Sequence, residues 1–251
     1  MNSMGDAVVR IGPMLAVVVV ILAVVAAGVS YAGSTGYWRE SVIATVRAVI
    51  QLAALAAVLG AVIQRFWASV LFIAVMACVA AWTSARRIAG GRGLWRAAVR
   101  CTVPVALSTV VIVAMLVVVG VLPSSGLAMI PVAGIMFGGA MNTTSLAGRR
   151  AHDDLRTRSG EVDAALSLGL ASRDARLEIC RPGAAAALVP GIDQTRSVGL
   201  VTIPGAFVGM ILGGASTTAA AVMQLFVLVS LLAVSAIAAV VTTELVAREL
   251  L

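Results

Sequence analysis

The chain has 251 residues, of which 61% are hydrophobic and 12% are charged, and its mean hydropathy is +1.07. Several apolar runs approach about 20 residues, the length that crosses a bilayer, so the composition excludes an ordinary soluble protein and predicts an all-α, polytopic helical membrane protein. The net charge is +7, and every one of the 18 basic residues is arginine. Without lysine there is no P-loop, and arginines without interleaved aromatic residues do not predict a nucleic-acid surface.

We expect about seven membrane-spanning helices in a single permease-sized domain that covers residues 1–251. In chain order, they are expected at 11–32, 40–63, 67–88, 99–121, 127–147, 197–214 and 218–246. The first apolar run is longer than the apolar region of a typical signal peptide, so it is counted as a span.

The arginines are unevenly distributed between the two sides that these spans define. Fifteen of them, including the runs at 86–100 and 149–196, fall on one side, whereas only Arg10 and Arg65 fall on the other and Arg47 lies within the second span. Because arginine is retained on the cytoplasmic side, we expect an external N-terminus and a cytoplasmic C-terminus, in a multi-pass protein of the cytoplasmic (inner) membrane. The segment 148–196 is then a long cytoplasmic loop, a length that is usually functional or disordered.

The second span carries two polar residues on one face. Arg47 and Gln51 are separated by four residues, which places them on the same side of a helix. A charged residue within a span usually faces a cavity or a partner, but Arg47 is also close enough to the membrane edge to snorkel. Both interpretations remain open at this stage.

Glycines recur every four residues in the fifth and sixth spans. They are Gly134 and Gly138 in the fifth span, and Gly205, Gly209 and Gly213 in the sixth. Such faces allow two helix backbones to approach closely, so we expect Gly205 and Gly209 to contact the Gly134–Gly138 face of the same chain or of a second copy. Pro204 is expected to kink the sixth span. The pattern does not distinguish a static contact from a moving one.

Other polar or sulfur-bearing residues in the spans are candidates for a transport pathway. With Arg47 and Gln51, the candidates are Met141, Asn142, Met210 and Gln224. Methionine thioethers can bind soft metals but more often fill apolar cores, and neutral amides often form interhelical hydrogen bonds. The spans contain no cluster of histidine, cysteine and carboxylate residues, and the three cysteines and His152 follow no motif, so no metal site is assigned.

The loop sequence "SGEVDAALSLGLASRDARLEICRPGAAAALVPG" predicts two helices joined by a glycine turn. Glu161 and Asp163 come early in the first helix, where the helix dipole favours acidic side chains. Gly169 suits the positive φ of a helix C-terminus, and Ser172 is expected to cap a second helix that runs through Cys180. One apolar face is expected to comprise Val162, Ala165, Leu166 and Leu168. The element is either a docking surface for a cytosolic protein or an amphipathic hairpin that lies on lipid.

Four stretches carry a resemblance to a known family. They are "RAVIQLAALAAVLG" (47–60), "IPVAGIMFGGAMNTTSL" (130–146), "LSLG" (166–169) and "LVPGIDQTRSVGLVTIPGAFVGMILGG" (188–214), with Gln224 at a matching position in the last span. The chain resembles the FetB-type iron-export permeases of ABC transporters, a family that includes plant aluminium-tolerance permeases. It departs from the family pattern at Gly139, at Ala206–Phe207 and at Met210, and each change replaces a polar or sulfur-bearing side chain.

The resemblance implies a homodimer in the lipid membrane that carries two copies of a separate cytosolic ATPase, which binds ATP and magnesium. This chain would then be neither an enzyme nor the holder of a cofactor, and it would export iron, another metal or a small solute. The residues implied to couple with the ATPase are Glu161, Asp163, Ala165, Leu168, Gly169, Ser172, Arg173 and Arg176.

Two alternatives remain, a secondary ion-coupled transporter and a structural membrane subunit. The first needs a titratable carboxylate at mid-membrane, whereas the acidic residues lie in loops or near span ends.

Overall fold

The computed structural model describes residues 12–90 and 93–251, and the chain divides into two compact units, residues 1–62 and 63–251. The described residues form helices joined by short connections, with an isolated bridge between Val198 and Thr202 as their only strand-like pairing. The expected all-α fold is therefore confirmed. Ile11, at the start of the first expected span, and Arg10 and Arg92, used to orient the chain, lie outside the described residues.

The first unit is a hairpin of two helices, α1 (Pro13–Ala32) and α2 (Trp38–Val62). Gly36 has a φ of +79° in the turn between them, and the rings of Tyr31 and Trp38 meet edge to face at 5.9 Å. A cavity of about 710 Å³ with apolar walls lies between the two helices. Neither helix has a buried residue, although both are long and apolar enough to cross a membrane.

The second unit contains four long helical segments. They are α3 (Phe66–Ala89), the continuous run of α4 (Leu94–Thr102), η2 (Val103–Leu107) and α5 (Ser108–Val118), then α6 (Gly126–Thr157) and α11 (Thr217–Ala247). The π-helical turn η2 contains Pro104, which cannot donate a backbone hydrogen bond. The hydroxyl of Ser108 donates to the Pro104 carbonyl at 2.7 Å, so the helix continues through the distortion.

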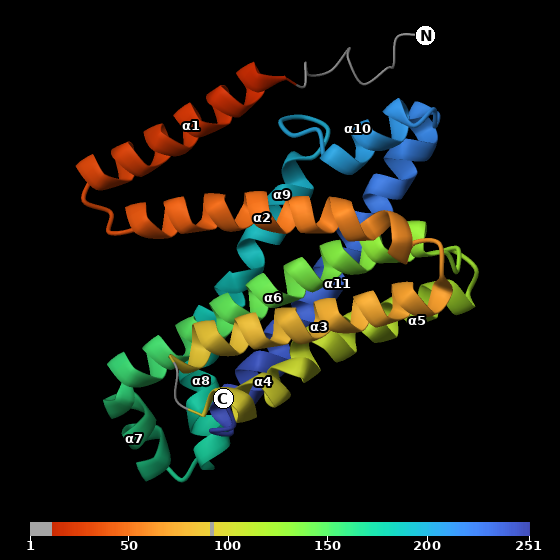
Figure 1. Cartoon of the computed structure of the whole chain (residues 1–251). Helices are drawn as coiled ribbons and strands as arrows, with labels where there is room; N and C mark the ends of the chain where they lie inside the picture. Colours follow the sequence, from red (N-terminus) through yellow and green to blue (C-terminus); the bar gives the residue numbers. More distant parts are fainter. Residues whose placement is uncertain (1–11, 91–92) are drawn as a thin grey trace. The chain divides into compact units, whose positions relative to one another are not determined.

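The core of this unit lies where α3, α5, α6 and α11 meet (Figure 1). Met136 and Phe137 of α6 are almost fully buried there, and small alanines occupy much of the remaining space. Three glycines of α6 lie against α3: an added Cβ atom would be 2.1 Å from Ser69 Oγ at Gly126, 3.0 Å from Met76 Cε at Gly134 and 2.6 Å from Ile88 Cδ1 at Gly148. Close packing through small residues, as expected for membrane helices, therefore occurs along the α3–α6 contact.

The predicted glycine contact of the sixth span is wrong within the chain. A Cβ atom added at Gly138, Gly205 or Gly209 would meet no other atom within 4 Å, and one at Gly213 would meet only carbonyl oxygens of its own helix. The spacing of four correctly placed Gly138, Gly205 and Gly209 in helices, whereas Gly213 is the C-cap that follows α10. It did not reveal that α10 (Gly205–Leu212) is too short to lie along α6. Contact with a second copy of the chain remains a prediction.

Within the described residues, six helical segments are long and apolar enough to cross a membrane, and the expected span at 197–214 is a broken segment instead. Before it come α7 (Ser159–Ser167), α8 (Ser172–Ala185), η3 (Ala186–Leu188) and α9 (Val189–Ser197). Residues 198–204 are not helical, because Gly199 has a φ of +79° and Pro204 has an extended backbone. Pro204 therefore precedes α10 as its N-cap and does not kink a continuous helix.

The expected loop at 148–196 is also more structured than predicted. Helix α6 continues to Thr157, and α8 packs against both α6 and α11. Only α7 and the turn after it project from the end of the unit (Figure 1).

Candidate functional site

The first candidate site is the docking element, defined as residues 159–176, which comprises α7, the turn after it and the start of α8. Helix α7 begins beside Arg158, whose guanidinium donates to both carboxylate oxygens of Glu161 at 2.7 and 2.5 Å. This hydrogen bonding holds the pKa of the Glu161 carboxyl below its usual value. Arg158 also donates to the carbonyl of Ile179 at 3.3 Å, so the start of α7 is attached to α8.

Gly169 ends α7 in the way that the sequence predicted. Its φ is +91°, its N–H donates to the Leu166 carbonyl at 2.9 Å, and the N–H of Leu170 donates to the Ala165 carbonyl at 3.2 Å. These two bonds form a Schellman motif, which requires a left-handed residue that glycine adopts without strain. The turn between the two helices is therefore defined by this one residue.

The apolar face predicted for α7 is divided between two sides. Val162 is buried against Ala175 and Ile179 of α8, and Ala165 packs against the same cluster. Leu168 is 83% exposed because it follows the end of α7 at Ser167, and Leu166, in the last turn of the helix, is 40% exposed. The exposed leucines give the tip of the docking element an apolar surface.

Two further details of the docking element differ from the prediction. Ser172 is the first residue of α8 and Ala171 is its N-cap, so Ser172 does not cap the helix through its side chain. The sequence "LASRD" offered Ser172 as the polar residue nearest the helix start, but α8 begins one residue too early for that role. The helix also extends past Cys180 to Ala185.

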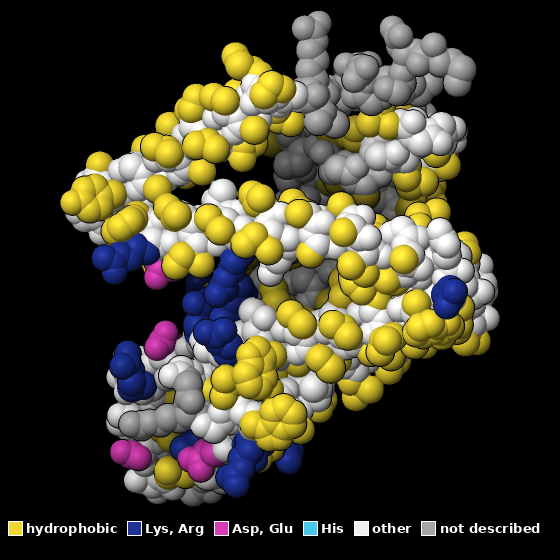
Figure 2. Space-filling view, viewed as in Figure 1, with side chains coloured by type: hydrophobic (Ala, Val, Ile, Leu, Met, Phe, Trp, Pro, Cys, Tyr) yellow, Lys and Arg dark blue, Asp and Glu magenta, His cyan; other side chains and the backbone are white. Residues whose placement is uncertain are grey.

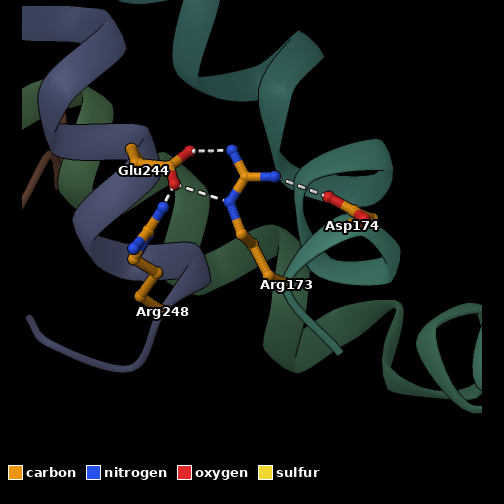
Figure 3. Close-up of polar contacts among 4 residues, drawn as sticks. All are labelled: Arg173, Asp174, Glu244 and Arg248. Atoms are coloured by element: carbon orange, nitrogen blue, oxygen red, sulfur yellow. Dashed lines mark hydrogen bonds and ion pairs between the residues drawn. The ribbon is translucent and has the colours of Figure 1, made fainter. Parts of the chain in front are cut away.

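The docking element is attached to the end of α11 by the Glu244 joint, which comprises Arg173, Asp174, Glu244 and Arg248 (Figure 3). Arg173 donates to the two carboxylate oxygens of Glu244 at 2.6 and 2.8 Å and to Asp174 at 2.6 Å. Arg248 donates to Glu244 at 2.6 Å from the same helix. Such paired, charge-assisted bonds fix the orientation of both partners.

The sequence identified Arg173 and Arg176 but not their partners. Arg176 pairs with Glu249, beyond the end of α11. Glu244 was placed at a span end without a role, and its spacing of four residues from Arg248 was the available signal. The pairing with Arg173 joins residues 71 positions apart, so it depends on the fold.

Charged side chains gather at the end of the second unit that carries the docking element (Figure 2). Arg87 donates to Asn142 Oδ1 at 3.2 Å, and Arg100 donates to the carbonyl of Leu250. Arg87, in the last turn of α3, therefore lies beside the middle of α6, and Arg100, in the last turn of α4, lies beside the residues that follow α11. The elongated apolar surfaces of α3 and α5 carry few charges in the same view.

The second candidate site lies between α11 and the broken crossing, defined as residues 172–212. The broken crossing runs antiparallel to α11: Arg173 meets Glu244, a Cβ atom added at Gly191 would be 3.6 Å from Leu232, and Phe207 shares a cavity with Gln224. It includes the sixth span that the sequence predicted at 197–214, but only part of that range is helical.

Three cavities follow one another along α11 beside the broken crossing. The break cavity, of about 360 Å³, is lined by Val198, Gly199, Thr202, Ile203, Pro204, Phe207, Ala221, Gln224, Leu225 and Leu228. The middle cavity, of about 170 Å³, is lined by Gly139, Asn142, Thr143, Leu146, Ala187, Leu188, Pro190, Gly191, Gln194, Leu231 and Ser235. The third, of about 140 Å³, is lined by Leu177, Arg181, Ala185, Leu188, Ala239, Val240, Thr243 and Glu244.

The backbone at the break satisfies only part of its own hydrogen bonding. The carbonyl of Ser197 accepts the N–H groups of Leu200, Val201 and Thr202, and Gly199 donates to the Thr202 carbonyl at 2.9 Å. The C-terminus of α9 and the N-terminus of α10 lie on either side, with partial charges of opposite sign. Interrupted helices of this kind are tolerated at membrane depth where they are buried in protein or line a cavity.

Gln224 is the polar side chain that α11 contributes to the break cavity. It is only 7% exposed, and among the residues that the structure describes its Oε1 atom has no hydrogen-bond partner. The other pathway candidates are dispersed. Asn142 lines the middle cavity, Met141 packs on the core, and Met210 is half-buried in α10.

Arg47 and Gln51 are exposed on α2 in the first unit, whereas the other pathway candidates belong to the second unit. Gln194 and Ser235 of the middle cavity were not singled out from the sequence. The described ranges hold no group of three or more His, Cys, Asp or Glu residues that could bind a metal ion.

Comparison with known proteins identifies related membrane proteins along almost the whole chain. A family model described as "Uncharacterised protein family (UPF0014)" matches residues 14–251. UPF0014 membrane protein STAR2 of Oryza sativa subsp. japonica is 33% identical over 235 residues, which cover 93% of this chain and 80% of that protein. Protein ALUMINUM SENSITIVE 3 of Arabidopsis thaliana is 29% identical over 235 residues, which cover 93% and 84% of the two chains.

A bacterial relative shares a similar length. Probable iron export permease protein FetB of Escherichia coli (strain K12) is 26% identical over 230 residues, which cover 91% of this chain and 88% of that protein. No solved structure gives a significant match.

Proposed function

Because the chain belongs to the UPF0014 family of membrane proteins, we propose that it is the permease subunit of an ABC transporter, energised by a separate cytosolic ATPase. The docking element is the observation that carries this proposal. It is a short helix at the tip of the unit, ended by a Gly169 turn and surrounded by charged residues. Its exposed leucines offer an apolar surface, and the fully buried core of a protein interface is more apolar than its rim.

The attachment of the docking element to the rest of the subunit supports the same role. A surface that receives force from an ATPase must pass it to helices that line the transport pathway. Val162 packs on α8, and the Glu244 joint connects α8 with α11, so a displacement of the tip reaches two elements beside the three cavities. A hairpin that only rested on lipid would need neither connection.

The assembly proposed here contains two copies of the chain and two ATPase subunits in the cytoplasmic membrane of a cell. ATP and magnesium are bound by the ATPase, and the permease contributes no catalytic residue. The printed name of the Escherichia coli relative refers to iron export. By that likeness, we assign export of a metal or another small solute to this chain.

A secondary ion-coupled transporter is less well supported, since it needs a carboxylate that is free to exchange ions within the membrane. Glu244 is the acidic residue of α11, and both of its oxygens accept bonds from arginine. The Glu244 carboxylate is therefore paired with arginine and is not free to exchange ions.

Substitution at the glycine turn tests the docking role. Gly169→Ala places a Cβ at a φ of +91°, where an L-residue is strained, so we expect the docking turn to be displaced and copurification of the co-expressed ATPase to fall at least tenfold. Gly160→Ala is the matched control, because Gly160 lies in α7 with no atom near its added Cβ and no positive φ. Membrane content and monodispersity are measured for both.

A second variant tests the exposed surface without altering the backbone. Leu168→Asp changes an exposed side chain and should leave the fold intact while it weakens ATPase binding. If Gly169→Ala and Leu168→Asp both retain the ATPase as the wild type does, the docking assignment is wrong.

A further inference from the structure

We propose that the break cavity is the cargo site of the subunit and that it takes a small uncharged solute, with Gln224 as its polar contact. This inference rests on the proposed transport function and adds the chemical class of the cargo. It implies that a metal would pass this point as a neutral complex that keeps its own ligands, and not as a bare cation.

The size and position of the break cavity suit a small ligand. Its volume of about 360 Å³ falls within the range of small-molecule pockets, which are mostly apolar with a few polar groups that orient the ligand. It is bounded on one side by a regular helix, α11, and on the other by the irregular residues 198–204. Irregular backbone at this depth is consistent with a cavity that a ligand enters.

Gln224 provides the second, independent observation. An amide is a strong hydrogen-bonding group, and burying its oxygen without a donor is unfavourable. Within residues 12–90 and 93–251, however, no donor reaches Gln224 Oε1, although the residue is only 7% exposed. A ligand with a hydroxyl, an amide or a coordinated water would supply that donor from the cavity.

The walls of the break cavity determine the charge of the ligand. None of its ten lining residues has an ionisable side chain, and Asp193 and Arg196 on the adjacent α9 are exposed and pair with each other at 3.7 Å. The partial charges of the α9 and α10 ends oppose each other across the break. A bare cation would therefore leave water without a compensating carboxylate, which is strongly unfavourable, whereas an uncharged solute avoids that cost.

The other two cavities extend the site toward the docking end. Asn142, Gln194 and Ser235 give the middle cavity neutral polar groups, and ionisable residues line only the third cavity, where Glu244 belongs to the joint. From the docking end, the third cavity is thus lined partly by charged residues, the middle cavity partly by neutral polar groups, and the break cavity mostly by apolar residues. This order admits a solute that is soluble in water but has no net charge.

Cysteine labelling tests the charge preference of the cavity without knowledge of the cargo. Gln224→Cys is made in a Cys78→Ala background, because Cys78 is exposed whereas Cys101 and Cys180 are buried. The protein, in liposomes with its ATPase, is treated with three methanethiosulfonates of similar length: hydroxyethyl (neutral), trimethylammonium-ethyl (cationic) and sulfonatoethyl (anionic). Each rate is divided by the rate of that reagent with a free thiol, and the Cys78→Ala parent gives the background.

We expect the normalised rate at Gln224→Cys to be at least tenfold higher for the neutral reagent than for either charged one. Val222→Cys is the control, since Val222 is 64% exposed on α11 and does not line the cavity. Because a thiol that faces lipid remains protonated, this control should react slowly with all three reagents. Modification of Gln224→Cys by the neutral reagent should also lower ATP hydrolysis by the complex at least threefold.

Two results would overturn the proposal. One is a cationic rate that equals or exceeds the neutral rate, which would indicate a cation pathway. The other is a failure of all three reagents to modify Gln224→Cys in a folded complex, which would show that the cavity is closed to solutes. Copurification of the ATPase tests the proposed function separately. If the wild-type chain does not bind the ATPase, the ABC assignment is refuted. If the chain binds the ATPase but the ratio of labelling rates is not as expected, only the assignment of the cargo class is refuted.

Discussion

Two glycines on the same helix, Gly148 and Gly138, should respond in opposite ways to the same substitution. An alanine Cβ at Gly148 would lie 2.6 Å from Ile88 Cδ1 and 2.8 Å from Ile88 Cγ1, and Ile88 is β-branched and cannot easily rotate away. At Gly138 the added methyl would meet nothing within 4 Å. Both residues lie within α6, so the change in helix propensity is shared.

The expected magnitudes follow from these contacts. Adding a methyl group to a packed contact costs about 1–3 kcal/mol, and replacing glycine by alanine within a helix returns about 1 kcal/mol. Gly148→Ala should therefore destabilise the fold by about 1 kcal/mol, whereas Gly138→Ala should stabilise it by about 1 kcal/mol. For a chain of this size, a difference of about 2 kcal/mol separates the two thermal midpoints by roughly 4–8 °C.

Thermal unfolding of the purified variants in the same detergent measures this separation. Ile88→Ala removes all three contacting carbons, so the combination of Ile88→Ala with Gly148→Ala should cost less than the sum of the two single changes. Equal midpoints for Gly148→Ala and Gly138→Ala, or full additivity with Ile88→Ala, would refute the close α3–α6 contact.

Three further predictions concern the docking end. Glu244→Gln should reduce coupled ATP hydrolysis more than Arg173→Gln does. The reason is that Glu244→Gln leaves both Arg173 and Arg248 without their shared anion, whereas Arg173→Gln leaves the Glu244–Arg248 pair in place. Equal losses in a reconstituted ATPase assay would contradict the role of the Glu244 joint. Since Arg158 lowers the pKa of Glu161, their pair stabilises α7 above the usual carboxylate pKa of about 4.3 and should lose that contribution as the pH falls through the lowered value. The protection factors of the α7 amides, which correct for the intrinsic pH dependence of exchange, should fall below that pH in the wild type but not in Glu161→Gln. In intact cells, an impermeant thiol reagent should reach Gln64→Cys but not Arg158→Cys, and labelling at position 158 would reverse the orientation.

The sequence predicted the long apolar helices well, because their hydropathy and length depend on local composition. It placed Gly169 correctly for the same reason, since a left-handed helix end has a local signature. It missed the break at 198–204, where Val198, Leu200, Val201 and Ile203 are as apolar as a helical span requires. The positive φ of Gly199 and the position of Pro204 before α10 became apparent only with the backbone.

The candidate sites could be predicted only in part. Gln224 and Asn142 were identified as polar residues within spans, but the cavities that they line are formed by segments distant in the sequence. Arg173 was assigned to the docking element without its partner Glu244, because no local pattern connects the two. The exposure of Leu168 similarly depends on where α7 ends.

The broken crossing has a mechanical consequence for a subunit driven from one end. A continuous helix transmits an axial push along its whole length, because its hydrogen bonds resist compression, whereas an extended strand bends. From Ser172 to Ser197 the chain is helical throughout. Under the proposed function, a thrust applied at the docking element would therefore be carried toward Ser197, and the non-helical residues 198–204 would separate it from helix α10, which packs on the beginning of α11. On that proposal, residues 172–197 would move while α10 stays in place, and the boundary between the two would lie at the break cavity beside Gln224.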